Sequence, residues 1–275
     1  MTTPAAPDRT VAMIGGGQMA LALAAGFCRA GLVSATDIVV YDPHPPARER
    51  LAAAVPGVRF ADSPAHAAAA AGMVFLAVKP QQAAVACREI AGSLRPDAVL
   101  VSIAAGVTLA SLADMAGTNR LVRVMPNTPC LVGQGVSVVC ATPEVPAAAA
   151  ERVRDLLGAV GHVHEADESQ LNAVTGLSGS GPGFVALLVE ALADGGVKAG
   201  LPRSLALQLA VQTLSGTAAL LEQTGEHPAQ IKDRVSSPGG TTIAGLAVLE
   251  QRGVRSALID AVVAAAARAK ELGKS

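Results

Sequence analysis

The sequence predicts an α/β fold in which a mostly parallel sheet, covered by helices on both faces, precedes an all-helical C-terminal domain. Short strands alternate with helices from Thr10 to about Glu165. Each strand is a continuous apolar run, as in parallel strands that are buried on both faces. Beyond Glu165 the pattern is helical. We therefore expect a sheet domain over residues 1–165 and a helical domain over residues 166–275.

The first domain should alternate strands with helices as successive βαβ units do. The expected strands are Val11–Ile14, Asp37–Tyr41, Val58–Phe60, Met73–Val78, Ala98–Ile103, Leu121–Met125 and Val136–Cys140. The expected helices are Gln18–Ala30, Arg48–Val55, Pro64–Ala71 and Val145–Leu157, with helical turns before the strands at Ala98 and Leu121.

Four long helices are expected in the second domain: Pro182–Ala199, Pro202–Gln223, Thr241–Gln251 and Arg255–Leu272. The first two are apolar on most faces, which is typical of helices that are buried on all sides. A domain of about 110 residues has little other material to cover them. We therefore expect a second copy of the chain to cover them, in a homodimer formed through the C-terminal helices.

Composition excludes several classes of protein. Hydrophobic residues make up 51% of the 275 residues and aromatic residues only 2%. The two longest uncharged runs, Val124–Pro143 and Leu171–Val189, are long enough to span a bilayer. Both contain proline and several polar residues, so neither could satisfy its backbone in lipid as one continuous helix. We expect a soluble protein.

Charge and cysteine usage narrow the class further. The 21 basic and 22 acidic residues form no basic run, so no nucleic-acid partner is expected. The four cysteines form no CxxC motif and no secretory segment is recognised, which indicates reduced thiols and a cytoplasmic location. The five histidines lack metal-ligand spacing, so no metal site is expected. His162 and His164 are interpreted as surface residues at a strand end.

The segment GGGQMA (residues 15–20) follows the first strand and opens the first helix. It fits the G-x-G-x-x-G/A fingerprint of a Rossmann-type, dinucleotide-binding domain. Gly15 would make the tight turn, Gly17 would let the backbone approach a pyrophosphate, and Ala20 would allow close packing of helix on sheet. The helix N-terminus at Gln18 and Met19 would offer N–H groups to the anion.

Asp42 ends the second strand, 25 residues after Gly17, near the position where an acidic side chain accepts hydrogen bonds from the adenosine ribose. A carboxylate there would repel a 2′-phosphate and favour NADH. Arg48 lies six residues further on and could serve a phosphate instead. Asp42-Pro43 also fits a simple turn initiator. The choice between NADH and NADPH therefore stays open.

Further candidate cofactor contacts lie at the carboxyl ends of later strands, where open α/β sheets bind ligands. Two prolines stiffen the loop after the sixth strand, and the amide in that loop offers both donors and an acceptor. A plain connection remains the alternative for each segment. The candidates are Ala77, Val78, Lys79 and Pro80 after the fourth strand, Ala104 after the fifth, and Asn127 after the sixth.

The second domain contains two polar segments, each next to the start of an expected helix. Ser178–Gly183 precedes a long apolar helix with Pro182 in its first turn, and it could also be a tight crossing between domains. Val235–Thr242 (VSSPGGTT) combines four hydroxyl groups with a helix start at Thr241. It can therefore present N–H and hydroxyl groups to a carboxylate.

These motifs resemble, in order and spacing, those of pyrroline-5-carboxylate reductases. The matching segments are GGGQMA, LAVKPQ, SIAAGVT, RVMPNTP, AVTGLSGSGPGF, ADGGVKAGLPR and VSSPGGTTIAGLAVLE. The resemblance covers nearly the whole chain from Val11. It implies an N-terminal Rossmann domain, a helical domain that interlocks with a second subunit, and dimers that often assemble into decamers. It also implies reduction of 1-pyrroline-5-carboxylate, a cyclic imine with a carboxylate, to L-proline by NADPH or NADH, the last step of proline biosynthesis.

In such a reaction an imine can enter already protonated, so the site needs positioning and a hydrogen-bond partner more than a strong base. Thr242 is the candidate for the bond to the ring nitrogen. The segment around it would hold the carboxylate and could serve the nicotinamide of the partner subunit. Ser237, which would help to hold the carboxylate, is with Thr242 a candidate catalytic residue, and the other expected substrate contacts are Val235, Ser236, Gly239, Gly240 and Thr241.

Two alternative functions predict different sequence features. A 3-hydroxyacid dehydrogenase shares the two-domain plan but needs a general base, a lysine on the helix after a similar glycine motif. Residues 182–194 contain neither Lys nor His, and Lys198 and Lys232 lie near a helix end and in a polar stretch. A non-enzymatic redox sensor would explain the glycine loop but not the VSSPGGTT segment.

Overall fold

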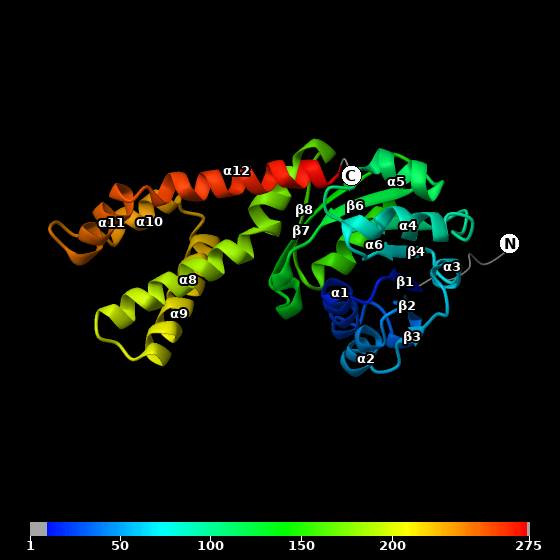
Figure 1. Cartoon of the computed structure of the whole chain (residues 1–275), viewed down its shortest axis with the longest axis horizontal. Helices are drawn as coiled ribbons and strands as arrows, with labels where there is room; N and C mark the ends of the chain where they lie inside the picture. Colours follow the sequence, from blue (N-terminus) through cyan, green and yellow to red (C-terminus); the bar gives the residue numbers. More distant parts are fainter. Residues whose placement is uncertain (1–9, 274–275) are drawn as a thin grey trace. The chain divides into compact units, whose positions relative to one another are not determined.

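The computed structural model describes residues 10–273. The chain divides into two compact units (Figure 1). The first runs to Gly179 and resumes at Ala264, and the second comprises Ser180–Val263. The domain boundary expected after residue 165 follows the end of the last strand, whereas compactness assigns the chain up to Gly179 to the first unit.

The first unit is built on an eight-stranded sheet with the order β3-β2-β1-β4-β5-β6-β7-β8. β1 lies between β2 and β4 and is parallel to both, so the chain changes its direction of winding there. This is the switch point at which doubly wound sheets bind ligands. The strands are β1 (Val11–Ile14), β2 (Ile38–Tyr41), β3 (Arg59–Phe60), β4 (Met73–Leu76), β5 (Val99–Ser102), β6 (Leu121–Met125), β7 (Gly135–Ala141) and β8 (Gly161–Glu165).

The sheet departs from a wholly parallel arrangement at one pair of strands. β7 runs antiparallel to β6. Only residues 126–134 connect these two strands, and a parallel pair would need a longer crossover. β8, which the sequence indicated only through a strand end at His162 and His164, pairs parallel with β7 after a crossover through α6 (Ala147–Gly158). Both histidines are exposed, as expected.

Helices cover both faces of the sheet and enclose two aliphatic cores. On one face lie α1 (Gln18–Arg29), α2 (Pro45–Ala54) and α6; on the other lie α3 (Pro64–Ala69), α4 (Pro80–Ile90) and α5 (Leu109–Ala116). Phe27 and Phe75, whose ring centroids are 5.7 Å apart, are the two buried rings of the first core. Most other core side chains are Val, Leu, Ile and Ala, as the ring-poor composition requires.

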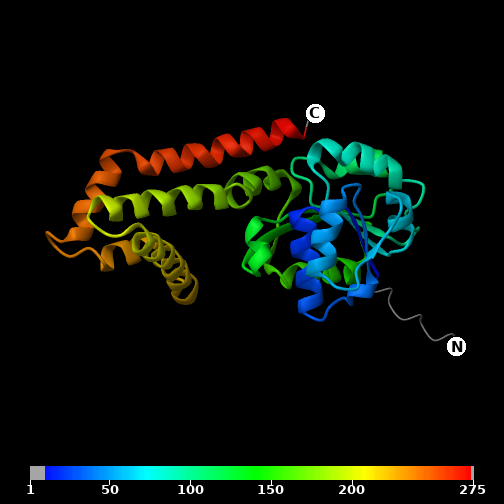
Figure 2. The same ribbon diagram turned by 60° about the horizontal axis from the view of Figure 1, so that its bottom comes forward.

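In the second unit every regular element that the structure describes is helical. Figure 2 shows these helices in yellow-green to red. They are α8 (Gly181–Lys198), α9 (Arg203–Thr224), α10 (Pro228–Arg234) and α11 (Thr241–Gln251), and α12 (Val254–Leu272) begins there and ends in the first unit. α11 has the bounds expected from the sequence, whereas α10 was not expected. α8 packs on α9 through a small core of Ala193, Ala206 and Ala210.

Many large apolar side chains of these helices are exposed in the single chain. Leu187 on α8 is 64% exposed, and Ile259 and Val263 on α12 are 58% and 62% exposed. By length and composition alone, the helical run 168–198 and α9 are also long and apolar enough to cross a bilayer. Few of their residues are buried within the chain, so this apolar surface calls for a covering partner.

The C-terminal end of α12 contacts the loop that follows β5 (Figure 1). Gly106 in that loop has a φ of +80°. A Cβ atom on Gly106 would lie 2.7 Å from the carbonyl oxygen of Ala269 and 2.9 Å from the nitrogen of Gly273. Both the backbone conformation and this contact therefore require glycine.

We expect Gly106→Ala to lower the free energy of unfolding by about 1–3 kcal/mol, because the new side chain must adopt a positive φ and displace the end of α12. Urea unfolding followed by circular dichroism measures the loss. Gly92→Ala is the matched control, since Gly92 has open space around it and no positive φ. An equal loss in both variants would contradict this account.

Candidate functional site

A cleft of about 730 Å³ opens at the carboxyl ends of β1, β2 and β4. Its walls are the glycine loop after β1, the turn after β2, and the connection from β4 into α4. Six of the residues expected to bind a cofactor line it: Gly15, Gly17, Asp42, Ala77, Val78 and Lys79.

Gly15 brings the ends of three strands together. Its N–H donates to the carbonyl oxygen of Tyr41 on β2 at 2.8 Å, while the N–H of Ala77 beyond β4 donates to Ile14 at 2.8 Å. Gly15 has a φ of +102°, and a Cβ atom there would lie 2.7 Å from the carbonyl oxygen of Ala77. The tight turn expected of this glycine is thus present and leaves no room for a side chain.

The N-terminus of α1 offers its N–H groups to a ligand. Gly17 is the N-cap, no side chain caps the helix, and its first turn carries no acidic residue. The first intrahelical bond runs from the N–H of Leu21 to Gly17 at 3.0 Å, so the N–H groups of Gln18, Met19 and Ala20 have no partner within the helix. A Cβ atom on Gly17 would meet only open space. This end of α1 therefore fits a pyrophosphate.

Asp42 is the turn initiator considered as one of its two roles, and it also lines the cleft. Its Oδ1 accepts the N–H of His44 at 2.8 Å, which makes it a turn initiator. Its Oδ2 accepts the N–H of Gly16 at 2.6 Å, so the same carboxylate holds the glycine loop and faces the cleft. Arg48, the alternative phosphate ligand, lies over the Phe60 ring at 5.1 Å and does not line the cleft.

Several cleft residues were missed from the sequence. Arg50 of α2 lines the cleft, as do Gln81, Gln82 and Glu89 of α4. The lining positions of α4 recur at the three- and four-residue spacing of one helix face. That spacing was a usable signal, but the bounds of α4 had not been predicted.

Asn127 uses its side-chain amide to join backbone segments. Its Oδ1 accepts the N–H of Val136 on β7 at 2.9 Å, and its Nδ2 donates to the carbonyl oxygen of Ser178 at 3.2 Å. The side chain is buried, with the residue 9% exposed. A cofactor contact from Asn127 would have to use the second amide hydrogen or the remaining lone pair.

The carbonyl of Ser178 is free to accept from Asn127 because the helical hydrogen-bond pattern is interrupted at this point. Residues Thr175–Gly179 form a π-helical turn that leads into α8, and Ser180 also has helical backbone angles. Pro182 lies in the first turn of α8, as expected, but the helical backbone already begins in the turn before it. In an α-helix the carbonyl of Ser178 would accept from residue 182, but proline has no N–H. The amide of Asn127 satisfies this carbonyl instead.

Pro80 and Ala104 do not line the cleft. Pro80 is the first residue of α4. Ala104 is 2% exposed, and its N–H points to the hydroxyl of Ser102 at 3.3 Å.

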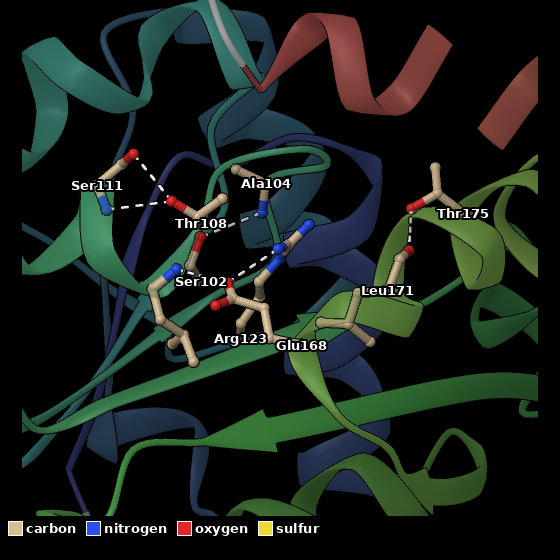
Figure 3. Close-up of polar contacts among 9 residues, drawn as sticks. Ser102, Ala104, Thr108, Ser111, Arg123, Glu168, Leu171 and Thr175 are labelled. Atoms are coloured by element: carbon tan, nitrogen blue, oxygen red, sulfur yellow. Dashed lines mark hydrogen bonds and ion pairs between the residues drawn. The ribbon is translucent and has the colours of Figure 1, made fainter. Parts of the chain in front are cut away.

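A half-buried ion pair fixes the connection from β5 to α5 (Figure 3). Arg123 of β6 is 3% exposed and donates to Oε1 of Glu168 at 3.0 Å. The same oxygen accepts the N–H of Leu109, the first residue of α5, at 2.6 Å. The Thr108 hydroxyl caps α5 by accepting the N–H of Ser111 at 3.1 Å. Glu168 thus supplies the negative charge that a helix N-terminus favours.

The VSSPGGTT segment connects α10 to α11 in the second unit. The N–H of Gly240 donates to Ser237 at 3.0 Å, closing a turn in which Gly239 has a φ of +65°. Gly240 is the N-cap of α11, and no side chain caps this helix. The first intrahelical N–H is that of Ala244, so the N–H groups of Thr241 and Thr242 have no helical partner.

The other residues of this segment are accessible in the single chain. Val235 is 56% exposed at the end of α10, and Ser236 donates to the carbonyl of Lys232 at 2.7 Å. The nearby cations are paired, Lys232 with Asp233 and Arg234 with Glu226. Gly240, one of the expected carboxylate contacts, has its N–H occupied, whereas the N–H groups of Thr241, also expected, and of the neighbouring Thr242 have no helical partner.

Neither thiol nor metal chemistry is indicated. Burial raises the pKa of the thiols of Cys28, Cys87, Cys130 and Cys140, that of Cys87 to about 11, so none is poised as a thiolate nucleophile. Within residues 10–273, no group of three or more His, Cys, Asp and Glu side chains could hold a metal ion.

Comparison with known proteins covers both units. Residues 168–272 match the family model for pyrroline-5-carboxylate reductase dimerisation, and residues 10–106 match that for NADP oxidoreductase, coenzyme F420-dependent.

The pyrroline-5-carboxylate reductase of Synechocystis sp. is 46% identical over 263 residues, which are 95% of this chain and 97% of that protein. That of Pisum sativum is 44% identical over 263 residues, 96% of each chain. The crystal structure of Plasmodium falciparum pyrroline carboxylate reductase with NADP bound has a TM-score of 0.88 at 32% identity and covers 96% of this chain and 98% of its own.

Asn127→Ala should lower the free energy of unfolding by about 2–4 kcal/mol, because it leaves the Val136 N–H and the Ser178 carbonyl without partners. Asn127→Asp should recover only part of this loss, since a carboxylate accepts from Val136 but cannot donate to Ser178. Chemical denaturation measures both values. Gln134→Ala removes an exposed amide from the same loop and is the control. Unchanged stability in the Asn127 variants would show that its two contacts are dispensable.

Proposed function

The chain belongs to the pyrroline-5-carboxylate reductase family, and we propose that its two units divide the family's reaction between a cofactor cleft and a substrate-binding segment. The reaction is the NAD(P)H-dependent reduction of 1-pyrroline-5-carboxylate to L-proline, the last step of proline biosynthesis. The observation that carries this function is the family match along nearly the whole chain, which includes both the glycine loop and the VSSPGGTT segment. Family membership also decides against a hydroxyacid dehydrogenase and against a redox sensor.

The first unit is proposed to hold the cofactor, which supplies a hydride when bound. Gly15 and Gly17 admit the pyrophosphate to the backbone, and the N–H groups of Gln18, Met19 and Ala20 bind it. Asp42 accepts hydrogen bonds from the adenosine ribose. Ala77, Val78 and Lys79 line the cleft beyond β4, where they shape the wall along which the cofactor extends. Pro80, Ala104 and Asn127 hold the neighbouring loops.

The second unit is proposed to hold the substrate. The N–H groups of Thr241 and Thr242, at the positive end of α11, bind its carboxylate, and the hydroxyl of Ser237 adds a further donor. Val235, Ser236, Gly239 and Gly240 give the segment its shape. The paired cations of α10 leave this recognition to backbone and hydroxyl groups.

Thr242 is proposed to orient the reacting bond. Thr242 lies in the first turn of α11, where the residue is half-buried. A hydroxyl accepts a hydrogen bond from the N–H of a protonated imine and still does so from the amine product. The imine brings its own proton, so the residue acts by positioning the ring nitrogen.

The exposed apolar faces of the C-terminal helices are proposed to form a homodimer. A dimerisation domain spans residues 168–272, and these helices carry most of the large exposed apolar side chains of the described chain. A stable partner of the same sequence would remove them from water, as obligate interfaces do. Cysteines held as free thiols fit a reducing compartment, and we propose a cytoplasmic location.

Thr242→Ala should lower kcat with pyrroline-5-carboxylate by about 10²-fold, the effect of losing one positioned hydrogen bond, and leave the Kd for NAD(P)H unchanged. Loss of NAD(P)H absorbance measures turnover, and nicotinamide fluorescence measures binding. Thr242→Ser should restore most of the activity, because it keeps the hydroxyl. Thr36→Ala, at an exposed threonine of the first unit, is the control. Full turnover without the Thr242 hydroxyl would remove this residue from the mechanism.

Leu187→Glu should convert a dimer, or a larger assembly such as a decamer built from dimers, into monomers, because it places a charge in the proposed apolar interface. Sedimentation velocity measures the mass. Val132→Glu is the matched control, since Val132 is 71% exposed in the first unit, outside the C-terminal helices. A wild-type protein that sediments as a monomer would refute the interface.

A further inference from the structure

We propose that Asp42 makes this enzyme prefer NADH to NADPH. The inference rests on the proposed function, because it takes the cleft at the switch point to be the cofactor site. Asp42 lines that cleft directly after β2, beside the glycine loop. An acidic side chain at this place in a dinucleotide-binding sheet faces the adenosine ribose, whose 2′ position carries the phosphate that distinguishes NADPH.

The Asp42 carboxylate is held in place by two backbone groups. Its Oδ2 accepts the Gly16 N–H at 2.6 Å and its Oδ1 accepts the His44 N–H at 2.8 Å. Two such bonds, one on each oxygen, prevent the side chain from rotating away from an incoming phosphate. A carboxylate has about four acceptor positions, so the remaining lone pairs can still accept from ribose hydroxyls.

The same bonds remove the donors that a 2′-phosphate would use. Phosphate sites are commonly built from unpaired backbone N–H groups in loops of this kind. The N–H groups of Gly16 in the glycine loop and of His44 in the turn after β2 already donate to Asp42. A phosphate would therefore meet a fixed negative charge and would find these two amides occupied.

The cations around the cleft do not offset the repulsion between the Asp42 carboxylate and a 2′-phosphate. Arg50 and Lys79 line it, but both are exposed. Exposed, flexible cations contribute little to binding in salt. Arg48 packs on the Phe60 ring, outside the lining.

Binding measurements without the imine test this inference. Nicotinamide fluorescence titrations of the wild-type protein should give a Kd for NADH at least about tenfold below that for NADPH at low salt. The ratio should narrow as salt rises from about 20 mM to about 300 mM, because screening weakens the repulsion. AMP should compete better than adenosine 2′,5′-bisphosphate; because these two molecules differ only in the 2′-phosphate, the comparison isolates the discrimination at the ribose.

Asp42→Ser and Asp42→Asn should each shift the ratio of the two Kd values toward NADPH by about tenfold or more, with thermal melts to confirm folding. Glu89→Gln is the matched control, because it removes a negative charge from the same cleft without touching the turn after β2, and it should leave the ratio within about twofold. If the wild-type protein binds NADPH as tightly as NADH, the proposed role of Asp42 is wrong, but the cofactor cleft and the proposed function still stand. Binding of neither nucleotide would overturn the cofactor cleft and the proposed function with it.

Discussion

The end of β1 is the constraint on which the rest of the cofactor unit depends. Gly15 there has a positive φ and lies so close to the backbone of Ala77 that a Cβ atom would overlap it. Hydrogen bonding continues past the ends of β1 and β4 here, because Gly15 donates to Tyr41 of β2 and Ala77 donates to Ile14 of β1, and the chain then turns into α1. The open N-terminus of α1, the position of Asp42 and the walls of the cleft all follow from this one junction.

Much of the fold was predictable, because the relevant signals are local. Gly17 and Gly31 bracket α1, and the hydroxyl-rich segment before Thr241 marks the start of α11. The direction of β7 was less accessible, since it depends on the length of the connection from β6. The pairs Arg123–Glu168 and Asn127–Ser178 could not be predicted, because 45 and 51 residues separate their members.

Asn127 and Asp42 show why a residue's place in a motif does not settle its role. Both lie in loops at the carboxyl ends of strands, where ligand contacts are expected. The side chains of both also form hydrogen bonds with backbone groups. Asn127 is nearly enclosed, so its amide acts mainly within the protein. Asp42 lines the cleft, so the same kind of bracing fixes a charge where a ligand can meet it. Accessibility to the cleft separates the two cases.

The path of α12 has a consequence for biosynthesis. The chain leaves the first unit at Gly179 and returns to it at Ala264, so that Gly273 reaches the loop of Gly106. The nascent sheet therefore emerges from the ribosome well before the segment that completes its packing, and domains generally fold as units during synthesis. The Gly106 loop can pack only after the last turn of α12 has been synthesised. This contact joins residues that are far apart in the sequence, and such contacts slow folding. Premature termination within the helical unit would release a sheet with this loop uncovered.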